Sequence, residues 1–567
     1  MGDLFATLPA LPERFNLCDY FLDHNLEAGR GDKVALIQAG DAGAADYRTY
    51  KQVANNARRV AGALRQCGVR PEERVLIVLP DGFAFAETFF GVLRAGAVFA
   101  MVNPLLKRGD FEHYLAYAKP RVVVTAAAVL PELLAAAAAS PHTEVLLVDG
   151  VEQASSIGDA PAEGAPPPAD AAGRLEVVPF AVALEWDGVY EAGYLEPTGP
   201  DDLAGWLFTS GSTGHPKACV HTHADFRWSC ETYAKQVAGY REDDVCLSVP
   251  KLFFGYATGT NLMFPFAVGA TAVLFPERST EDRMFDHVER YKVTFLTNVP
   301  TMINKLLQSP RCDAVDLSSL RVSLSAGEAL PGALYDAWMA RTGVEILDGI
   351  GSAEMFHIYI SGYPGRVRTG SLGNVVPGYE VEIVDAAGRP VEDGEVGRLR
   401  VRGGSTALCY WGDKQKSRET FQAEWCTTGD MFRRDAEGYY FYEGRADDLL
   451  KVSGIFVSPL EIENALLEHD AVAEVCVVGH EEEADLVKPY AFVVCAAGAT
   501  GCDELAADLK AFLKDRLAPY KYPRWFAWCE DLPKNDRGKI ARKDLKARLA
   551  GAPAAAPAAS APTEDAQ

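Results

Sequence analysis

Leu207-Phe208-Thr209-Ser210-Gly211-Ser212-Thr213-Gly214-His215-Pro216-Lys217 is the stretch from which the fold of this chain is inferred. Glycines let a backbone turn tightly and approach an anion closely. Successive N–H groups in such a turn form an anion-binding concavity, to which the hydroxyls and Lys217 add donors. The stretch therefore predicts a phosphate loop. It is not the loop of P-loop NTPases, because no lysine directly follows Gly214.

A flexible Ser/Gly-rich linker is the plain alternative for this stretch. Two apolar, strand-like runs argue against it, since residues 204–208 precede the stretch and residues 218–220 follow it. Linkers rarely lie between two such strands. The phosphate loop is the better interpretation.

Length and charge limit the classes of protein that this chain can belong to. A chain of 567 residues is too long for one core, so two or more domains are expected. The net charge of −24 disfavours nucleic acid and anionic membranes as partners. An acidic protein that binds polyphosphate must gather positive charge locally, which draws attention to Lys217, Arg445 and Lys539.

Cysteine usage and apolar runs indicate the compartment. The 12 cysteines are scattered without a CxxC pair, which is typical of reduced thiols in a cytoplasmic protein. The N-terminus lacks the basic and apolar segments of a signal peptide. The apolar runs near 75–79 and 97–102 are too short or too interrupted to span a bilayer. We expect a cytoplasmic protein without a membrane partner.

Strands alternate with helices over the first 350 residues, which predicts an α/β fold. The Ala- and Pro-rich residues near 155–190 interrupt this order as a flexible surface insert. Residues 379–402 favour antiparallel hairpins. A small α+β domain is expected over 446–549, followed by a disordered Ala/Pro tail over 550–567. The expected helices lie near 15–27, 47–67, 84–95, 459–468 and 503–517, and the expected strands near 34–37, 74–79, 96–104, 120–125, 144–149, 242–248, 269–275, 294–296, 320–326, 344–351, 473–478 and 489–494.

Four further motifs carry chemistry. A carboxylate that follows a parallel strand, such as Glu354, points into the crevice where such sheets bind ligands. An acidic residue such as Asp430 can accept both hydroxyls of a ribose. An ammonium such as that of Lys539 can neutralise charge while a carboxylate attacks a phosphate. The four motifs are Asp348-Gly349-Ile350-Gly351-Ser352-Ala353-Glu354, Thr427-Thr428-Gly429-Asp430, Gly444-Arg445-Ala446-Asp447-Asp448-Leu449-Leu450-Lys451 and Leu532-Pro533-Lys534-Asn535-Asp536-Arg537-Gly538-Lys539.

In this order, the phosphate loop and these motifs resemble the adenylate-forming superfamily of acyl- and aryl-CoA ligases, peptide-synthetase adenylation domains and luciferases. The resemblance covers about residues 15–545 and fails over 155–190. It implies a large N-terminal domain, 1–445, built from α/β subdomains and a distorted β-barrel. It also implies a small, mobile C-terminal α+β domain.

The resemblance implies that the chain binds ATP, Mg²⁺ and coenzyme A. Glu354 would ligate the metal, and Lys539 would act in adenylate formation. Lys451 would reach the site only after the small domain rotates about a hinge at Asp447. The ATP-binding residues implied in this way are Thr209, Ser210, Gly211, Ser212, Thr213, Gly214, Lys217, Gly327, Glu328, Asp348, Gly349, Asp430 and Arg445.

Two positions depart from the superfamily pattern. Ala218 replaces the usual glycine after the loop lysine, and Ala353 replaces the usual threonine that touches the α-phosphate. Loss of one hydrogen bond to a charged group costs roughly 1–2 kcal/mol. The departures therefore predict a weakened phosphate contact.

Two aromatic segments, near 252–259 and 354–359, most resemble the acid site of benzoate–CoA ligases. A flat aromatic acid suits a slot with aromatic walls and glycine floors. For His357, an ordinary core histidine is an equal alternative. The acid-binding residues that this resemblance implies are Phe254, Gly255, Tyr256, Gly351, His357 and Ile358.

We expect an ATP-dependent aryl–CoA ligase that forms an acyl-adenylate and then an aryl-CoA thioester. Benzoate, a hydroxybenzoate and 2-aminobenzoate all remain open as the acid. One rival is the loading of a carrier-protein phosphopantetheine by the same residues. A second is a nucleotide-binding protein with weakened catalysis, suggested by Ala218 and Ala353. A simple P-loop ATPase is disfavoured because the Walker lysine is missing.

Overall fold

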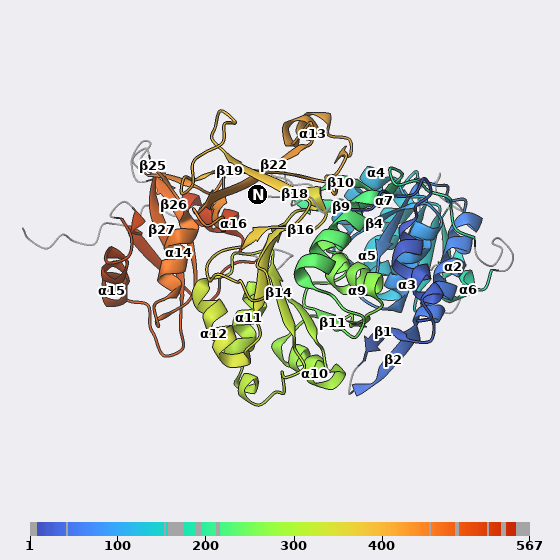
Figure 1. Ribbon diagram of the computed structural model, residues 1–567, viewed down its shortest axis with the longest axis horizontal. Coiled ribbons are helices and arrows are strands. Elements are labelled where there is room, and N and C mark those ends of the chain that lie inside the picture. Colours follow the sequence, from blue (N-terminus) through green and yellow to red (C-terminus); the bar gives the residue numbers. More distant parts are fainter. Residues whose placement is uncertain are drawn as a thin grey trace, which may run out of the picture.

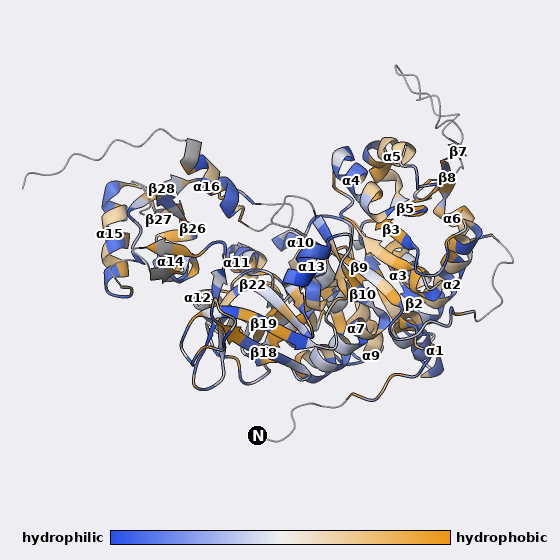
Figure 2. Cartoon of the chain, turned by 90° about the horizontal axis from the view of Figure 1, so that it is seen from above, coloured by the Kyte–Doolittle hydropathy of each residue, from blue (hydrophilic) through white to orange (hydrophobic). Residues whose placement is uncertain are grey.

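A computed structural model describes residues 8–40, 43–151, 155–156, 175–186, 194–210, 216–452, 455–481, 487–518, 521–534 and 540–551. Two nine-stranded sheets form the bulk of the molecule, and a small domain lies at one end (Figure 1). Viewed from above, this small domain, with α14 and α15, stands apart from the helices around the large sheets (Figure 2).

The first sheet is parallel over its centre and carries the motif over 348–354. Its strand order is β17-β16-β15-β14-β13-β11-β12-β1-β2. The neighbouring strands from β15 to β1 run parallel, whereas β16, β17 and β2 are antiparallel additions at the edges. The strands are β1 (Val34–Ala39), β2 (Ala45–Thr49), β11 (Val245–Ser248), β12 (Thr271–Leu274), β13 (Phe295–Asn298), β14 (Val322–Ala326), β15 (Ile346–Gly351), β16 (Ile358–Ser361) and β17 (Asn374–Val375).

The second sheet carries the phosphate-loop hairpin at one side. Its strand order is β20-β10-β9-β4-β3-β5-β6-β8-β7. The apolar run from Val75 to Val78 is fully buried, as expected for a strand of a parallel sheet with both faces covered. The strands are β3 (Arg74–Val78), β4 (Val98–Met101), β5 (Val122–Ala126), β6 (Val145–Asp149), β7 (Ser155–Ser156), β8 (Glu176–Pro179), β9 (Leu203–Ser210), β10 (Pro216–Thr222) and β20 (Cys409–Tyr410).

Helices cover both sheets. Helix α2 begins with a reciprocal cap, in which the backbone N–H of Gln52 donates to the Thr49 hydroxyl and the N–H of Thr49 donates to the Gln52 side chain. At Gly91 of α3, a Cβ would lie 2.5 Å from Val60, so glycine lets α2 and α3 pack closely. The main helices of the large domain are α2 (Tyr50–Gln66), α3 (Phe83–Arg94), α4 (Arg108–Ala118), α5 (Leu130–Ala139), α7 (His223–Ser229), η4 (Cys230–Ala238), α9 (Phe264–Val268), α10 (Glu281–Tyr291), α11 (Pro300–Gln308) and α12 (Gly332–Thr342).

The predicted antiparallel hairpins form a five-stranded sheet, in which β18, β19, β22 and β21 are neighbours and β23 pairs with β22. A separate three-stranded sheet is the centre of the small domain, beside a short β24–β25 hairpin. Half-buried Arg542 connects the last helix to this centre through an ion pair with Glu463, at 2.5 Å. The elements are β18 (Tyr379–Val384), β19 (Gly397–Gly403), α13 (Lys414–Thr420), β21 (Phe421–Gln422), β22 (Trp425–Arg434), β23 (Tyr440–Arg445), β24 (Leu450–Val452), β25 (Ile455–Val457), α14 (Pro459–Leu467), β26 (Val472–Glu481), β27 (Val487–Cys495), α15 (Asp503–Lys514), β28 (Trp525–Cys529) and α16 (Arg542–Gly551).

The predicted α/β order is confirmed, with three local differences. Residues 47–49 end strand β2, and the expected helix begins only at Tyr50, because Thr49 caps it. The expected helix over 15–27 consists of η1 (Asp19–Asp23) followed by α1 (His24–Glu27). The expected flexible insert contains β8 and α6 (Phe180–Ala183), whose apolar residues Val177, Val178 and Phe180 are buried. Residues 157–174 and 187–190 of the insert and the tail from 552 lie outside the described residues.

No helix in the described ranges has the length and apolar character needed to cross a membrane.

Candidate active site

The motif over 348–354 lies at the carboxyl end of β15, next to that of β14, and the short helix within it contacts β9 of the phosphate-loop hairpin. Ala326 and Gly349 are register partners in the parallel pair β14–β15, so Gly327, which follows β14, lies near Gly351 at the end of β15. Gly327 has a φ of +89°, a conformation that favours glycine and turns the chain away from the sheet. Ligands of open α/β sheets bind at this edge.

Two glycines let β15 and β16 approach closely. A Cβ at Gly349 would lie 2.9 Å from the carbonyl oxygen of Ile360, and one at Gly351 would lie 2.6 Å from that of His357. Real side chains do not tolerate such contacts, so both positions need glycine. A register irregularity between Ile350 and Gly351 widens the turn that follows.

The turn between β15 and β16 separates two kinds of chemistry. It contains the short helix η7 (Ala353–Met355), followed by Phe356 with φ 61° and ψ −56°. Positive φ is unusual for a bulky residue and costs about 1–3 kcal/mol, which the surrounding packing must offset. Glu354 lies on one side of this strained residue, and the buried ring of His357 lies on the other.

Glu354 is held by two contacts from a distant segment. Its Oε1 accepts a hydrogen bond of 2.6 Å from the hydroxyl of Tyr410, and its backbone carbonyl accepts one of 2.8 Å from the N–H of Ala407. The preceding carbonyl, of Ala353, lies 2.7 Å from Nε2 of buried His221. These contacts fix the direction of the carboxylate.

A single carboxylate fits Mg²⁺, which usually keeps several waters and takes its other ligands from substrate phosphates. In the part of the chain that the structure describes, no three His, Cys, Asp or Glu side chains are grouped as metal ligands. Glu354 would therefore hold the ion together with the phosphates of a nucleotide, and not within an all-protein cage.

Lys217 lies in β10 next to the phosphate loop. Its Nζ lies 2.9 Å from Oδ2 of Asp413 and 5.7 Å from the centre of the Tyr410 ring. The Lys217 side chain is 14% exposed, and its ammonium is held beside the same segment that contacts Glu354. Thr209 is the register partner of Lys217 on β9. Residues 211–215 of the loop lie outside the described residues, and Ser210 is described by its backbone only.

Asp348 is a buried carboxyl with an unused acceptor. Its Oδ1 has no hydrogen-bond partner among the described residues, although the side chain is only 6% exposed. Burial raises the pKa of Asp348 to about 8. A buried acceptor without a partner, at the end of a parallel strand, suits a donor from a ligand such as an exocyclic amino group. Glu328 instead accepts hydrogen bonds from the N–H and hydroxyl of Thr301 at the start of α11.

Asp430 and Arg445 face each other across β22 and β23. They are register partners, and Nη1 of Arg445 donates to Oδ1 of Asp430 at 3.4 Å. The Asp430 side chain is 13% exposed, whereas that of Arg445 is 52% exposed. The structure therefore brings these two predicted ribose and phosphate residues together at one edge.

The predicted hinge lies directly after β23. Asp447 is exposed, whereas the neighbouring Asp448 pairs with Lys546 at 3.2 Å and approaches Arg542 at 3.8 Å. Asp448 thus connects this segment to helix α16 of the small domain. Lys451 lies in β24 and is described by its backbone only, and Lys539 lies outside the described residues.

The segment of Phe254, Gly255 and Tyr256 is anchored by two charged side chains, of which Asp81 is buried and Lys251 half-buried. The carboxylate of Asp81 accepts the N–H of Leu252 at 2.8 Å, and Lys251 donates to the Phe275 carbonyl at 2.9 Å. Burial raises the pKa of Asp81 and lowers that of Lys251. These contacts fix the start of the segment, whose helix α8 (Gly255–Thr258) begins immediately afterwards.

His357 is the centre of an aromatic cluster beside this segment. Its Nε2 lies 3.2 Å from the Tyr256 carbonyl oxygen, and its ring centre lies 5.6 Å from that of Tyr256. Burial lowers the pKa of His357 to about 3, so the ring is neutral near pH 7. The Tyr256 hydroxyl and Nδ1 of His357 are buried without a partner among the described residues. Ile358, in the next position, is also buried.

Several residues of this site were not predicted from the sequence. Tyr410 and Asp413 lie about 200 residues after Lys217, and β20 brings them there by pairing with β10. Asp81 and His221 likewise contact motif residues from other elements. The aromatic Tyr410-Trp411 pair is a weak signal by itself, and nothing in its spacing indicates a contact with Glu354.

Two family models match this chain. Residues 22–411 match the AMP-binding enzyme family, and residues 461–539 match the AMP-binding enzyme C-terminal domain.

The chain belongs to the AMP-binding enzyme family. The resemblance to the adenylate-forming superfamily is thereby confirmed.

Members of the AMP-binding enzyme family resemble the chain along nearly its whole length. Benzoate–CoA ligase of Thauera aromatica is 42% identical over 96% of this chain and 99% of the relative. The solved benzoate CoA ligase from Burkholderia xenovorans LB400 is 39% identical, with a TM-score of 0.81 over 94% of this chain and 99% of that one. The anthranilate CoA ligase AuaEII, solved in complex with anthranoyl-AMP, is 36% identical, with a TM-score of 0.86 over 95% and 98%.

The Tyr410 contact predicts a change in magnesium dependence. Tyr410→Phe keeps the buried ring but removes the hydroxyl that donates to Glu354. A hydrogen bond to a charged group contributes about 1.5–3 kcal/mol, so we expect the half-saturating Mg²⁺ concentration for nucleotide binding to rise about tenfold or more. Nucleotide binding at graded Mg²⁺ concentrations measures it, with Trp411→Phe as the matched control. An unchanged Mg²⁺ dependence would contradict the positioning of Glu354 by Tyr410.

The buried Asp348 predicts a pH-dependent stability. The folded-state pKa of about 8 lies above the ordinary value of 3.8, so the favourable contribution of the neutral acid is complete below pH 4. It is lost progressively as the pH rises towards 8. Asp348→Asn cannot ionise and keeps an acceptor oxygen. The quantity to compare is the melting temperature of the variant minus that of the unchanged protein. We expect this difference to be larger at pH 8 than at pH 5. Thermal denaturation at both pH values measures this, and a constant difference would contradict the assignment.

Proposed function

We propose that this chain is an ATP-dependent aryl–CoA ligase. The carboxylate of an aromatic acid attacks the α-phosphorus of ATP, the bond to pyrophosphate breaks, and an aryl-adenylate forms. The thiolate of coenzyme A then attacks the acyl carbon, the bond to AMP breaks, and the aryl-CoA thioester is released. The carboxylate is a poor electrophile, and adenylation gives it a good leaving group.

One observation supports this function most. In the β15–β16 hairpin, the carboxylates of Asp348 and Glu354, which suit a nucleotide, precede the strained residue Phe356. The neutral ring of His357 and its aromatic cluster follow it. An acid bound beside His357 would have its carboxylate near the phosphates that Glu354 and Lys217 face. Such proximity converts a reaction of two molecules into an oriented local step. Relatives named for benzoate and anthranilate point to the same class of acid.

In the first step, the described residues would bind and orient the nucleotide. Asp348 would accept a hydrogen bond from the amino group of the base, and Asp430 would accept the ribose hydroxyls. Lys217 would leave Asp413 to neutralise phosphate charge, as Lys539 would from the small domain. Mg²⁺, when bound at Glu354, would supply additional neutralisation of the phosphates. These fixed charges stabilise the developing transition state.

In the acid site, a neutral wall suits an uncharged aromatic ring. His357 is neutral near pH 7 because burial lowers its pKa, and Tyr256 and Phe254 add aromatic surface. Gly255 and Gly351 would leave room for the flat ring.

The rival functions have less support. Transfer to a carrier protein would use the same residues, but the more similar benzoate relatives, at 42% and 39% identity, are named for coenzyme A as the acceptor. A nucleotide-binding protein without catalysis would not need the contacts that direct both Glu354 and Lys217. Activity with free coenzyme A separates these possibilities.

The two lysines of the small domain give the sharpest test of this function. The unchanged enzyme should release pyrophosphate from ATP only when benzoate or a substituted benzoate is present. Lys539→Ala should lower the rate of adenylate formation by about 10²–10³, because one preorganised charge is lost. It should still convert synthetic benzoyl-AMP and coenzyme A to thioester at nearly the original rate.

Lys451→Ala should show the reverse, forming benzoyl-AMP and stalling before the thioester. Single-turnover assays of each half-reaction measure both variants. Equal losses in both steps would contradict a two-orientation mechanism, and absence of acid-dependent pyrophosphate release from the unchanged enzyme would contradict the function itself.

A further inference from the structure

A hollow lies at the amino ends of the parallel strands of the first sheet, opposite the carboxyl ends that carry the candidate active site. Its volume is about 420 Å³, and it is lined by residues around the amino ends of β14 and β15, among them Tyr240, Arg241, Arg321, Val322, Glu345 and Leu347. Val322 is the first residue of β14, whereas Ala326, beside the candidate site, is its last. At about 3.3 Å per residue, the strand separates the two places by roughly 13 Å.

One arginine of this hollow is fixed and charge-balanced. Arg321 donates two hydrogen bonds to Asp244, at 2.6 and 3.3 Å, and one to the Gly239 carbonyl, at 3.0 Å. Asp244 is only 2% exposed, so its charge is used within this cluster. Arg321 therefore presents its guanidinium in a defined position at the wall of the hollow.

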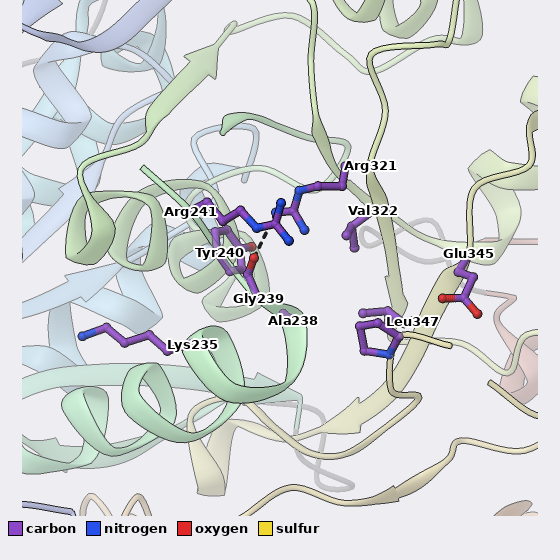
Figure 3. Close-up of a pocket in the computed structure, with 10 residues that line it drawn as sticks. Lys235, Ala238, Gly239, Tyr240, Arg241, Arg321, Val322, Glu345 and Leu347 are labelled. Atoms are coloured by element: carbon purple, nitrogen blue, oxygen red, sulfur yellow. Dashed lines mark hydrogen bonds between the residues drawn. The ribbon is translucent and has the colours of Figure 1, made fainter. Parts of the chain in front are cut away.

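The second arginine, Arg241, has no counter-ion of this kind within the described ranges. The backbone N–H of Arg241 donates to Asp244 at 2.8 Å, but its exposed side chain forms no ion pair within the described ranges. The side chains of Arg241 and Arg321 reach toward each other from opposite sides (Figure 3). Asp244 is the counter-ion of the Arg321 guanidinium, whereas the Arg241 guanidinium has none within the described ranges. An added oxyanion would neutralise this second charge.

The rest of the lining is mostly apolar or aromatic, with Lys235 and Glu345 as its charged members. Val322 and Leu347 are buried, and the buried ring of Tyr240 stacks on Phe295 with ring centres 3.9 Å apart. Glu345 lies across the hollow from the arginines (Figure 3), and its carboxylate accepts the N–H of Gly365 at 2.8 Å. This single negative charge disfavours ligands that carry several negative charges.

We propose that this hollow is a second binding site, for a small aromatic monocarboxylate. The guanidiniums recognise the carboxylate, and the apolar wall covers the ring. The volume is near the lower end of that of ligand pockets and suits one ring, not a nucleotide. The choice of an aromatic acid rests in part on the proposed function, which brings such acids to this protein, but the site is separate from the catalytic one.

Fluorine NMR of 4-fluorobenzoate tests the site directly. The spectrum is recorded with the full-length protein while a non-hydrolysable benzoyl-AMP analogue occupies the acid site. We expect saturable binding to remain, and to weaken about tenfold or more in Arg241→Gln because a charge-assisted contact is lost. Arg398→Gln, an exposed arginine of β19 without an ion pair in the described part of the chain, is the matched control and should bind as the unchanged protein does.

Three results would overturn the proposal. One is the absence of binding once the analogue is present. A second is an equal effect of Arg241→Gln and Arg398→Gln. A third is displacement of 4-fluorobenzoate by equal concentrations of acetate or inorganic phosphate, which would mean that the ring is not recognised. Failure of the proposed function is distinguishable, because then the unchanged protein neither binds the analogue nor releases pyrophosphate with benzoate.

Discussion

The close approach of β15 and β16 is the constraint on which the candidate site depends. Side chains at positions 349 and 351 would meet backbone atoms of the facing strand at 2.9 and 2.6 Å, so only glycine allows this pairing. The pairing in turn sets the strained turn at Phe356. That turn directs Glu354 toward the phosphate-loop hairpin and His357 into the aromatic cluster. Both halves of the proposed reaction are thus positioned by one short backbone segment.

Contacts from outside this hairpin fix the directions of Glu354 and Lys217. The β20–α13 segment contributes Tyr410 to Glu354 and Asp413 to Lys217, so one element controls both the predicted metal ligand and the loop lysine. Asp348 keeps an unused acceptor at the strand end, at the cost of a raised pKa. Buried polar groups without partners are costly, and they persist where a ligand supplies the missing partner. The proposed nucleotide site therefore combines two charges held in position, Glu354 and Lys217, with the acceptor of Asp348 that has no partner among the described residues.

The sequence predicted the features that depend on local pattern. Apolar runs such as 74–79 and 320–326 indicated buried parallel strands, and the carboxylates after strands indicated the edge where ligands bind. Contacts made by strand pairing across the chain could not be predicted in this way. Tyr410 reaches Glu354 only because β20 pairs with β10, and Asp81 anchors Leu252 from another sheet. The sequence pattern also placed the start of a helix at residue 47, whereas β2 continues to Thr49, whose side chain caps the helix that begins at Tyr50. The roles of Lys451 and Lys539 remain predictions.

Acid-dependent exchange between ATP and labelled pyrophosphate in Gly351→Ala tests the central claim most directly. The added methyl group should displace the turn and, at roughly 1–3 kcal/mol for an overpacked contact, lower exchange about fivefold to 150-fold while the protein remains folded. Gly109→Ala, in a helix where a Cβ meets no atom within 4 Å, is the control and should exchange at the original rate. Unchanged exchange in Gly351→Ala would contradict the account that this hairpin positions both substrates.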